Sequence, residues 1–308
     1  MKLVFLGTPE FAVPSLEALV EAGHAVAAVY TQPDRPKGRG QQLAFPPVKD
    51  CALRLGLEVR QPLKIRHCLE ELATLESDAM VVVGYGQIIP QSIIDLPHYG
   101  IFNVHASLLP LYRGAAPMQW AVANGETVTG VSIMQIEAGL DTGPVLKAVE
   151  TCIGPEETSI GIAPRLAAMG ARLMVSVLEE VLAGRAVAVP QDHTRATLAP
   201  ILRKEDGLID WHRSAGEIHN RSRGFLPWPG AYTRFRGERL SIWRCRVAEG
   251  AASRAPGSLT AVQRRLFVSC GGGTAIELIE VQQEGRKRMT AEAFINGARI
   301  ADGDLLGE

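Results

Sequence analysis

The sequence predicts an α/β protein in which a doubly wound, mostly parallel sheet is followed by a smaller antiparallel β domain. Between residues 2 and 184, short runs rich in Val and Ile alternate with stretches of helical period. Such near-continuous apolar runs are typical of parallel strands that helices cover on both faces. From residue 231 to residue 282 the pattern changes to short alternating runs separated by glycine turns, as in small antiparallel sheets.

The alternation of strand and helix begins at the first residues. The apolar run 2–7 ends at Gly-Thr-Pro, and the stretch 14–23, with Pro at its start and Gly at its end, has helical spacing. Further strands are predicted at 25–32, 57–62, 78–86 and 100–107, and further helices at 48–56, 65–75 and 116–125. A short helix is expected before residue 100. This order predicts a Rossmann-like sheet.

Two strands and a long helix complete the first domain. The runs 130–137 and 144–150 flank the turn Ala-Gly-Leu-Asp-Thr-Gly, which predicts a hairpin-like pair, and the helical pattern 157–184 follows. The mixed Pro and charged composition of 185–206 is typical of a linker. We therefore expect a first domain at 1–188, a linker at 189–206 and a second domain at 207–308, with helices at 214–225 and 290–300 flanking its strands.

The composition is that of an ordinary globular protein, with 46% hydrophobic and 21% charged residues. No apolar run approaches the roughly 20 residues that cross a bilayer, and the N-terminal run is too short for a signal peptide, so we expect a cytoplasmic protein with no membrane partner. The five cysteines are scattered without a C-x-x-C pair, which argues against a disulfide framework and a zinc site. Nothing indicates an interface between copies, and we expect a monomer.

The charge is distributed unevenly along the chain. Residues 1–206 carry 17 Lys and Arg against 22 Asp and Glu, a net charge of −5, whereas residues 207–308 carry 15 against 11, a net charge of +4. A basic surplus attracts anionic partners such as nucleic acid, but a surplus of this size is also ordinary solubilisation. Charge alone favours the second interpretation.

Asn103 and His105 stand two apart in the predicted strand 100–107, so they project from the same face of it. Asp141 lies between Gly139 and Gly143 in the turn after 130–137, where its carboxylate can face Asn103 and His105. Ligands of doubly wound sheets bind at the carboxyl ends of the strands, where all three residues fall. Each one alone is more simply explained by a structural role in a strand end or turn. Together they predict a catalytic site.

An amide, an imidazole and a carboxylate suit a carbonyl that becomes tetrahedral. Asn103 and His105 would stabilise the oxyanion, and Asp141 would handle a proton. The first strand-to-helix turn, Gly-Thr-Pro-Glu-Phe-Ala, lacks G-x-G-x-x-G, and no G-x-x-x-x-G-K-[ST] occurs, so no nucleotide cofactor is indicated. No metal-ligand spacing occurs. The residues leave the reaction open among acyl and one-carbon transfers.

The segment Phe-Asn-Val-His-Ala-Ser-Leu-Leu-Pro-Leu-Tyr-Arg-Gly-Ala-Ala-Pro, with Gly-Leu-Asp-Thr-Gly, resembles the 10-formyltetrahydrofolate-dependent formyltransferases. The segments 5–19, 29–40 and 46–49 are similar to the branch of that family which formylates methionyl-tRNA. The resemblance covers essentially the whole chain. It implies a small OB-like barrel in the second domain, and transfer of the formyl group of 10-formyltetrahydrofolate to the α-amino group of methionine on initiator tRNA.

The resemblance also implies roles for individual residues. Asn103 and His105 would bind the oxyanion, and Asp141 would orient His105 and assist proton transfer. The tetrahydrofolate site would be lined by Ser107, Leu108, Leu109 and Pro110.

The insertion 33–49 carries Arg35, Lys37 and Arg39. Taken alone it is a solvated surface loop, too polar and too rich in Pro and Gly for a strand or a helix. In a protein that acts on tRNA, its basic residues would clamp phosphates at the acceptor end.

Two other functions remain open. One is a related formyltransferase that acts on a sugar amine or on glycinamide ribonucleotide, and the basic insertion counts against it. The other is a non-catalytic protein that binds tRNA or a nucleotide, and the complete set of Asn103, His105 and Asp141 counts against it.

Overall fold

The computed structural model describes residues 1–37, 42–250, 252–301 and 304–307. The chain divides into two compact units. The first comprises Met1–Pro117, Val128–Cys152 and Ile162–Pro200, and the second comprises Met118–Thr127, Ile153–Gly161 and Ile201–Glu308. The domain boundaries at 188 and 206 stay predictions.

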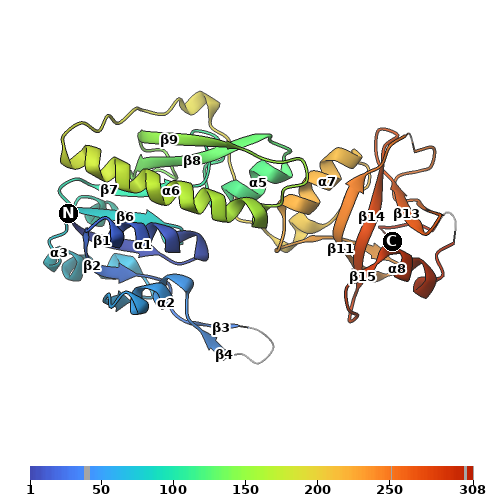
Figure 1. Cartoon of the computed structure of the whole chain (residues 1–308), viewed down its shortest axis with the longest axis horizontal. Coiled ribbons are helices and arrows are strands. Elements are labelled where there is room, and N and C mark those ends of the chain that lie inside the picture. Colours follow the sequence, from blue (N-terminus) through green and yellow to red (C-terminus); the bar gives the residue numbers. More distant parts are fainter. Residues whose placement is uncertain (38–41, 251, 302–303, 308) are drawn as a thin grey trace. The chain divides into compact units, whose positions relative to one another are not determined.

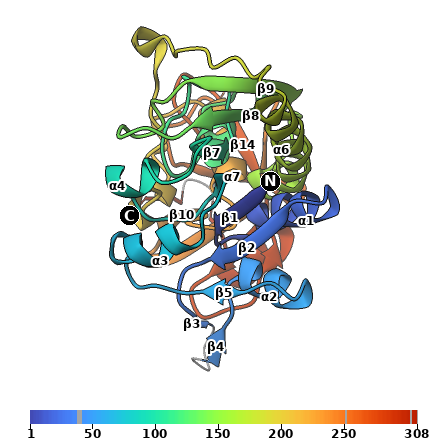
Figure 2. The same cartoon turned by 90° about the vertical axis from the view of Figure 1, so that its left-hand side faces the viewer.

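The first unit contains a mixed sheet of seven strands in the order β5-β2-β1-β6-β7-β8-β9 (Figure 1; β5 is labelled in Figure 2). The pairs from β5 to β7 are parallel, and β8 and β9 are antiparallel, so the Rossmann-like sheet and the hairpin-like pair at its edge are confirmed. The strands are β1 (Lys2–Gly7), β2 (Ala25–Tyr30), β5 (Val59–Arg60), β6 (Ala79–Val83), β7 (Ile101–His105), β8 (Val128–Gln135) and β9 (Val145–Cys152).

Helices cover both faces of this sheet. Figure 2 shows α1 (Val13–Glu21) and α6 (Ser159–Leu182) on one face and α3 (Leu69–Thr74) and α4 (Gln91–Ile94) on the other. Alternate strand residues such as Val4 and Met80 pack against the second pair of helices, in a buried cluster with Leu72 and Ile93. Helix α2 (Pro47–Arg54) packs against α1. Short 3₁₀ turns lie at Glu10–Ala12, Ile65–His67 and His193–Arg195.

Helix α6 is long and apolar enough to cross a membrane, a property that the sequence reading missed. Its apolar stripe is buried: Leu166, Met174 and Val177 have no exposed surface. At Gly170, a Cβ would lie 2.5 Å from the Val104 side chain of β7, so the helix backbone lies close against the sheet. The stripe is therefore explained by packing on β7 and β8.

The insertion 33–49 differs from its prediction, because its two arms pair as strands. β3 (Arg35–Lys37) and β4 (Gln42–Ala44) form an antiparallel ribbon that stands away from the main sheet (Figure 1). Backbone pairing needs no apolar side chains, and Pro36 falls between the flanking pairs of the ribbon, where an amide donor is not required. The absence of strands in this insertion was therefore predicted wrongly.

The second unit contains an antiparallel sheet in the order β10-β11-β14-β13-β12, with β15 paired to β14. Leu305 and Leu306 bridge to Ser258 and Phe235 beside the two edge strands β12 and β10, which closes the sheet in the manner of a small barrel. Its elements are α5 (Pro117–Ala123), a 3₁₀ turn (Lys204–Gly207), α7 (Ala215–Gly224), β10 (Ala231–Phe235), β11 (Glu238–Val247), β12 (Leu259–Val262), β13 (Arg265–Ser269), β14 (Ala275–Gln283), β15 (Met289–Thr290) and α8 (Ala291–Ala298).

Candidate active site

Strand β7 positions Asn103 and His105 at the carboxyl edge of the sheet. Its residues pair with β6 on one side (Val82 with Asn103) and with β8 on the other (His105 with Ser132). Asn103 is partly exposed, and within the described part of the chain its side-chain amide has no hydrogen-bond partner. His105 is 5% exposed. The amide is therefore available to a ligand at this edge.

The imidazole of His105 is held by the loop that follows the strand. Nε2 lies 2.9 Å from the carbonyl oxygen of Tyr112. Because a carbonyl oxygen only accepts, Nε2 carries the hydrogen. Nδ1 faces the carboxylate of Asp141, with 3.6 Å to Oδ2, which is an ion-pair distance but too long for a hydrogen bond. His105 can therefore donate from Nδ1 only as an imidazolium, and neutral it offers a lone pair there.

Asp141 reaches His105 from the loop between β8 and β9. Its backbone is left-handed, with φ of 50°, and its Oδ2 accepts a hydrogen bond of 2.8 Å from the backbone N–H of Gly114. Among the described residues, no group hydrogen-bonds to Oδ1. The side chain is 16% exposed, so one carboxylate oxygen is left to act on a ligand.

The turn after His105 is fixed from within. Ser107 is fully buried, and its hydroxyl donates to the carbonyl of Leu111 over 2.6 Å. Ser132 of β8 donates to the Ser107 carbonyl at 2.8 Å and accepts from the Leu109 N–H at 3.1 Å. Leu108, Leu109 and Pro110 are half-buried at the surface of this turn. Ser107 therefore shapes the turn, and the three residues after it present its apolar surface.

The structure describes the three basic residues of the insertion to different extents. Arg35 is exposed and, with Thr8, Gln32 and Tyr85, lines a cavity of about 490 Å³ at the carboxyl ends of β1, β2 and β6. Only the backbone pairing of Lys37 is described. Arg39 lies outside the described residues. Of the three basic residues, Arg35 is placed at the same edge of the sheet as Asn103.

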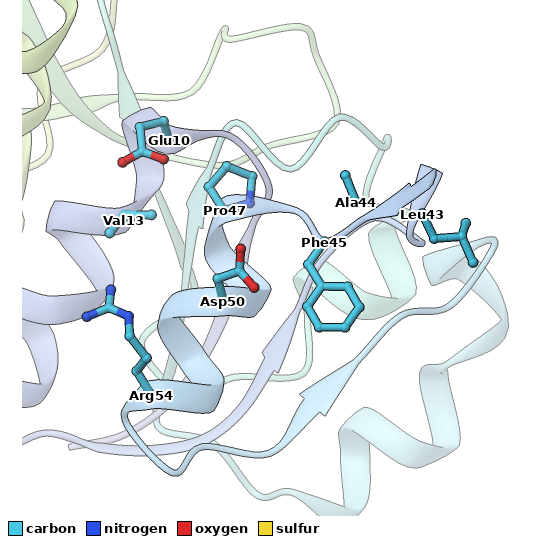
Figure 3. A pocket seen from close by; sticks show the side chains of 8 residues that line it. All are labelled: Glu10, Val13, Leu43, Ala44, Phe45, Pro47, Asp50 and Arg54. Atoms are coloured by element: carbon cyan, nitrogen blue, oxygen red, sulfur yellow. The ribbon is translucent and has the colours of Figure 1, made fainter. Parts of the chain in front are cut away.

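A second cavity of about 580 Å³ opens between the β3–β4 ribbon and helices α1 and α2 (Figure 3). Leu43 and Phe45 lie on the side of the β3–β4 ribbon, with Glu10 and Arg54 across from them. Lys49 stands 3.8 Å over the ring of Phe45. Asn103, His105 and Asp141, all of them described, do not line this cavity, so it is separate from the candidate catalytic residues.

Sequence reasoning missed the residues that hold this site together. Tyr112 and Gly114 lie in the segment 101–117, which also contains Asn103 and His105. Their position just after the predicted strand could therefore have indicated a contact with the site. Arg113 and Gln191 are buried and bonded to each other. Gln191 lies in the segment predicted as a linker, and no local pattern marks it.

Comparisons with known proteins agree with this architecture. Residues 1–178 match the family described as formyl transferase, and residues 201–299 match the formyl transferase C-terminal domain. The methionyl-tRNA formyltransferase of Koribacter versatilis is 58% identical over 100% of this chain and 99% of that protein. The methionyl-tRNA formyltransferase of Geobacter sulfurreducens is 47% identical over 100% of this chain and 97% of that protein.

Solved structures share the fold at lower identity. The N-formyltransferase of Helicobacter canadensis, in complex with folinic acid and dTDP-3-aminofucose, has a TM-score of 0.70 and 18% identity over 92% of this chain and 99% of that one. HypX from Aquifex aeolicus in complex with tetrahydrofolic acid has a TM-score of 0.64 and 14% identity over 96% of this chain and 47% of that one.

Proposed function

The chain belongs to the formyl transferase family, and from this premise we propose that it transfers a formyl group from a folate to the α-amino group of methionine on initiator tRNA. The donor in this proposal is 10-formyltetrahydrofolate. Relatives at 47% to 58% identity that match the whole chain, each a methionyl-tRNA formyltransferase, support the choice of substrate. The observation that carries the chemistry is the amide of Asn103, which has no partner in the described part of the chain, on the strand that also carries His105, which faces Asp141.

The reaction is attack of a neutral amine on an amide-like formyl carbon. The amine nitrogen forms a bond to that carbon, and the carbonyl oxygen becomes an oxyanion. The Asn103 amide and the Nδ1–H of a His105 imidazolium donate to the oxyanion. The free carboxylate oxygen of Asp141 accepts the proton that the amine loses and returns it to N10 of the folate as the carbon–N10 bond breaks. Asp141 also supplies the opposite charge beside the imidazolium.

The other residues predicted from the sequence complete the proposal. The folate packs against the turn of Ser107, Leu108, Leu109 and Pro110, where Ser107 acts by holding the turn and not by reaching the ligand. Arg35, Lys37 and Arg39 contact tRNA phosphates. Residues 1–188 form the catalytic domain, 189–206 the linker, and 207–308, with a net charge of +4, a tRNA-binding domain. The protein works as a cytoplasmic monomer, and the reaction as written uses no metal ion.

One assay tests the proposed function directly. Purified protein is incubated with 10-formyltetrahydrofolate and charged initiator tRNA, and N-formylmethionyl-tRNA is measured by mass spectrometry. Parallel reactions offer an amino sugar nucleotide and glycinamide ribonucleotide as acceptors. Formylation of the tRNA alone is expected. Formylation of a small amine alone would reassign the acceptor, and tRNA binding without turnover would remove the catalytic role.

A further inference from the structure

The carboxylate of Asp141 stands in a loop whose first residue, Ile136, packs against the core of the sheet and whose middle is exposed. The loop 136–144 joins β8 to β9, its residues 137–140 are exposed, and Asp141 itself adopts a left-handed backbone. An exposed loop with few buried apolar contacts opens locally at little cost in free energy. A group outside the exposed part of the loop would therefore help to fix the backbone that carries this carboxylate.

Gln191 supplies that support through its side-chain amide. Nε2 donates to the carbonyl oxygens of Asp141 at 2.9 Å and Gly143 at 2.6 Å. Oε1 accepts from Arg113, at 3.1 Å from Nε and 2.7 Å from Nη2. Gln191 is 8% exposed and Arg113 is 6% exposed. A carboxamide has two donors and two acceptor sites, and all four are in use here.

The same amide connects both halves of the catalytic pair. Arg113 stands between Tyr112, whose carbonyl accepts from His105 Nε2, and Gly114, whose N–H donates to Asp141 Oδ2. Gln191 therefore joins the backbone that orients His105 to the backbone that carries Asp141. It does so without a bond to either catalytic side chain.

The segment that carries Gln191 is itself held in place. Val189 and Val145 exchange two backbone hydrogen bonds of 2.9 Å. Farther along, the backbone of Arg113 bonds to Thr197 at 2.9 Å and to Ala199 at 2.7 Å. This part of the predicted linker lies along the loop after β7 like an added strand, so the position of Gln191 is fixed on both sides.

We propose that Gln191 is a positioning residue for the formyl transfer, which sets the Asp141 carboxylate relative to His105 through the two carbonyls it binds and through Arg113. The catalytic part of this inference rests on the proposed function. The structural part, that Gln191 restrains the 136–144 loop, does not depend on which amine is formylated.

The first test is kinetic and uses the full chain. Gln191→Met keeps the length of the side chain and removes all four hydrogen bonds. Gln191→Glu keeps an acceptor for Arg113 and replaces the donor to Asp141 and Gly143 by a carboxylate oxygen, which repels their carbonyl oxygens. Both variants are expected to lower kcat by about 10- to 100-fold with KM for both substrates unchanged, because displacement of a catalytic group by about 1 Å costs on that order.

The control variant is Asp192→Ala, next in the chain. Asp192 is exposed, and its carboxylate accepts hydrogen bonds from Thr194 within the same segment. Loss of this carboxylate is expected to leave kcat unchanged. The control therefore distinguishes a general disturbance of the segment from loss of the Gln191 hydrogen bonds. Equal kcat in wild type and Gln191→Glu would overturn the catalytic part of the proposal.

A double variant tests whether Gln191 acts through Asp141. If it does, adding Gln191→Met to Asp141→Asn should lower the residual activity no further. A purely structural role would reduce the residual activity again by the factor seen in the single variant, and that result would overturn the assignment.

Hydrogen exchange supplies a readout that needs no activity. Peptides covering 136–144 are expected to exchange at least about tenfold faster in Gln191→Glu than in wild type or Asp192→Ala, because opening of the loop becomes easier. Unchanged exchange would overturn the restraint. If wild type formylates no tRNA while the exchange effect is present, the proposed function fails and the restraint stands.

Discussion

Each of the two units holds a carboxylate beside basic side chains, but the number of bonds to that carboxylate differs. Glu277 of β14 in the second unit is 6% exposed and is bound by Arg265 at 2.8 and 2.6 Å and by Arg246 at 2.7 Å. In the first unit, Asp141 has one backbone N–H at 2.8 Å and His105 at 3.6 Å. Glu277 is fully paired, whereas Asp141 keeps one oxygen without a partner among the described residues.

The difference distinguishes a carboxylate that stabilises the fold from a carboxylate that is available to a ligand. Hydrogen bonds from Arg265, then from Arg246, lower the pKa of Glu277 to about 2 against the opposing effect of burial. A carboxylate held in this way stays charged, and both of its oxygens are already bound by arginine. Asp141 is held through its backbone by Gln191 and through Oδ2 by Gly114, while Oδ1 has no partner among the described residues. We infer that Glu277 stabilises its sheet and that Asp141 acts on substrate.

The largest effect is expected for Asp141→Asn. The amide can still accept from Gly114 but cannot take up a proton, so kcat should fall by about 10³-fold, within the range for loss of a general base. Tetrahydrofolate binding, measured by fluorescence titration, should be unchanged. Loss of folate binding together with loss of stability would make Asp141 structural and so erase the contrast with Glu277.

Asn103→Ala should come next. Removal of one donor to an oxyanion costs about 10²- to 10³-fold in kcat, or roughly 3 to 4 kcal/mol. The side chain makes no hydrogen bond within the described residues, so the melting temperature should barely change. Single-turnover kinetics beside a thermal melt measures both quantities, and a normal kcat would refute the oxyanion role.

Glu277→Gln should lower stability and leave kcat unchanged. The folded pKa of about 2 lies below the ordinary value of 4.5. The stabilisation is therefore present above about pH 5 and is lost as the pH falls toward 2, and by linkage it amounts to roughly 2 to 3 kcal/mol after allowance for the half-exposed arginines.

Urea unfolding at several pH values measures the effect of Glu277→Gln, which should flatten the acid limb of the stability profile. The matched control is Glu280→Gln on the same strand, where Arg288 is 3.7 Å away and the pair is more exposed. That variant should change stability by less than about 1 kcal/mol. Equal losses in the two variants would contradict the special pairing of Glu277.

The smallest effect is expected in the basic insertion. Arg39 lies outside the described residues, and the sequence places it between Gly38 and Gly40, which permit close approach to a phosphate. Arg39→Ala should raise KM for tRNA more than Arg35→Ala does, and should lower the slope of log affinity against log salt by about one. Parallel salt profiles for the variant and wild type would show that the insertion does not clamp phosphates.

The helices and strands could be predicted because short-range sequence patterns encode them. The alternation of apolar runs and helical patterns predicted the sheet of the first unit, the β8–β9 pair and the antiparallel strands of the second. The two-residue spacing of Asn103 and His105 placed them on one face of β7. These features depend on neighbours a few positions apart, because the periods of a strand and a helix are short.

The sequence alone determined which residues could do chemistry, but the tertiary structure decided what holds them. Ser107 turned inward to Leu111 because Ser132 of another strand anchors its turn. Part of the predicted linker bonds to the first unit through its backbone, and the side chain of Gln191 bonds to Asp141 and Arg113, 50 and 78 positions away. A buried amide must form its hydrogen bonds with whichever donors and acceptors the fold places beside it, and no local sequence pattern predicts those contacts.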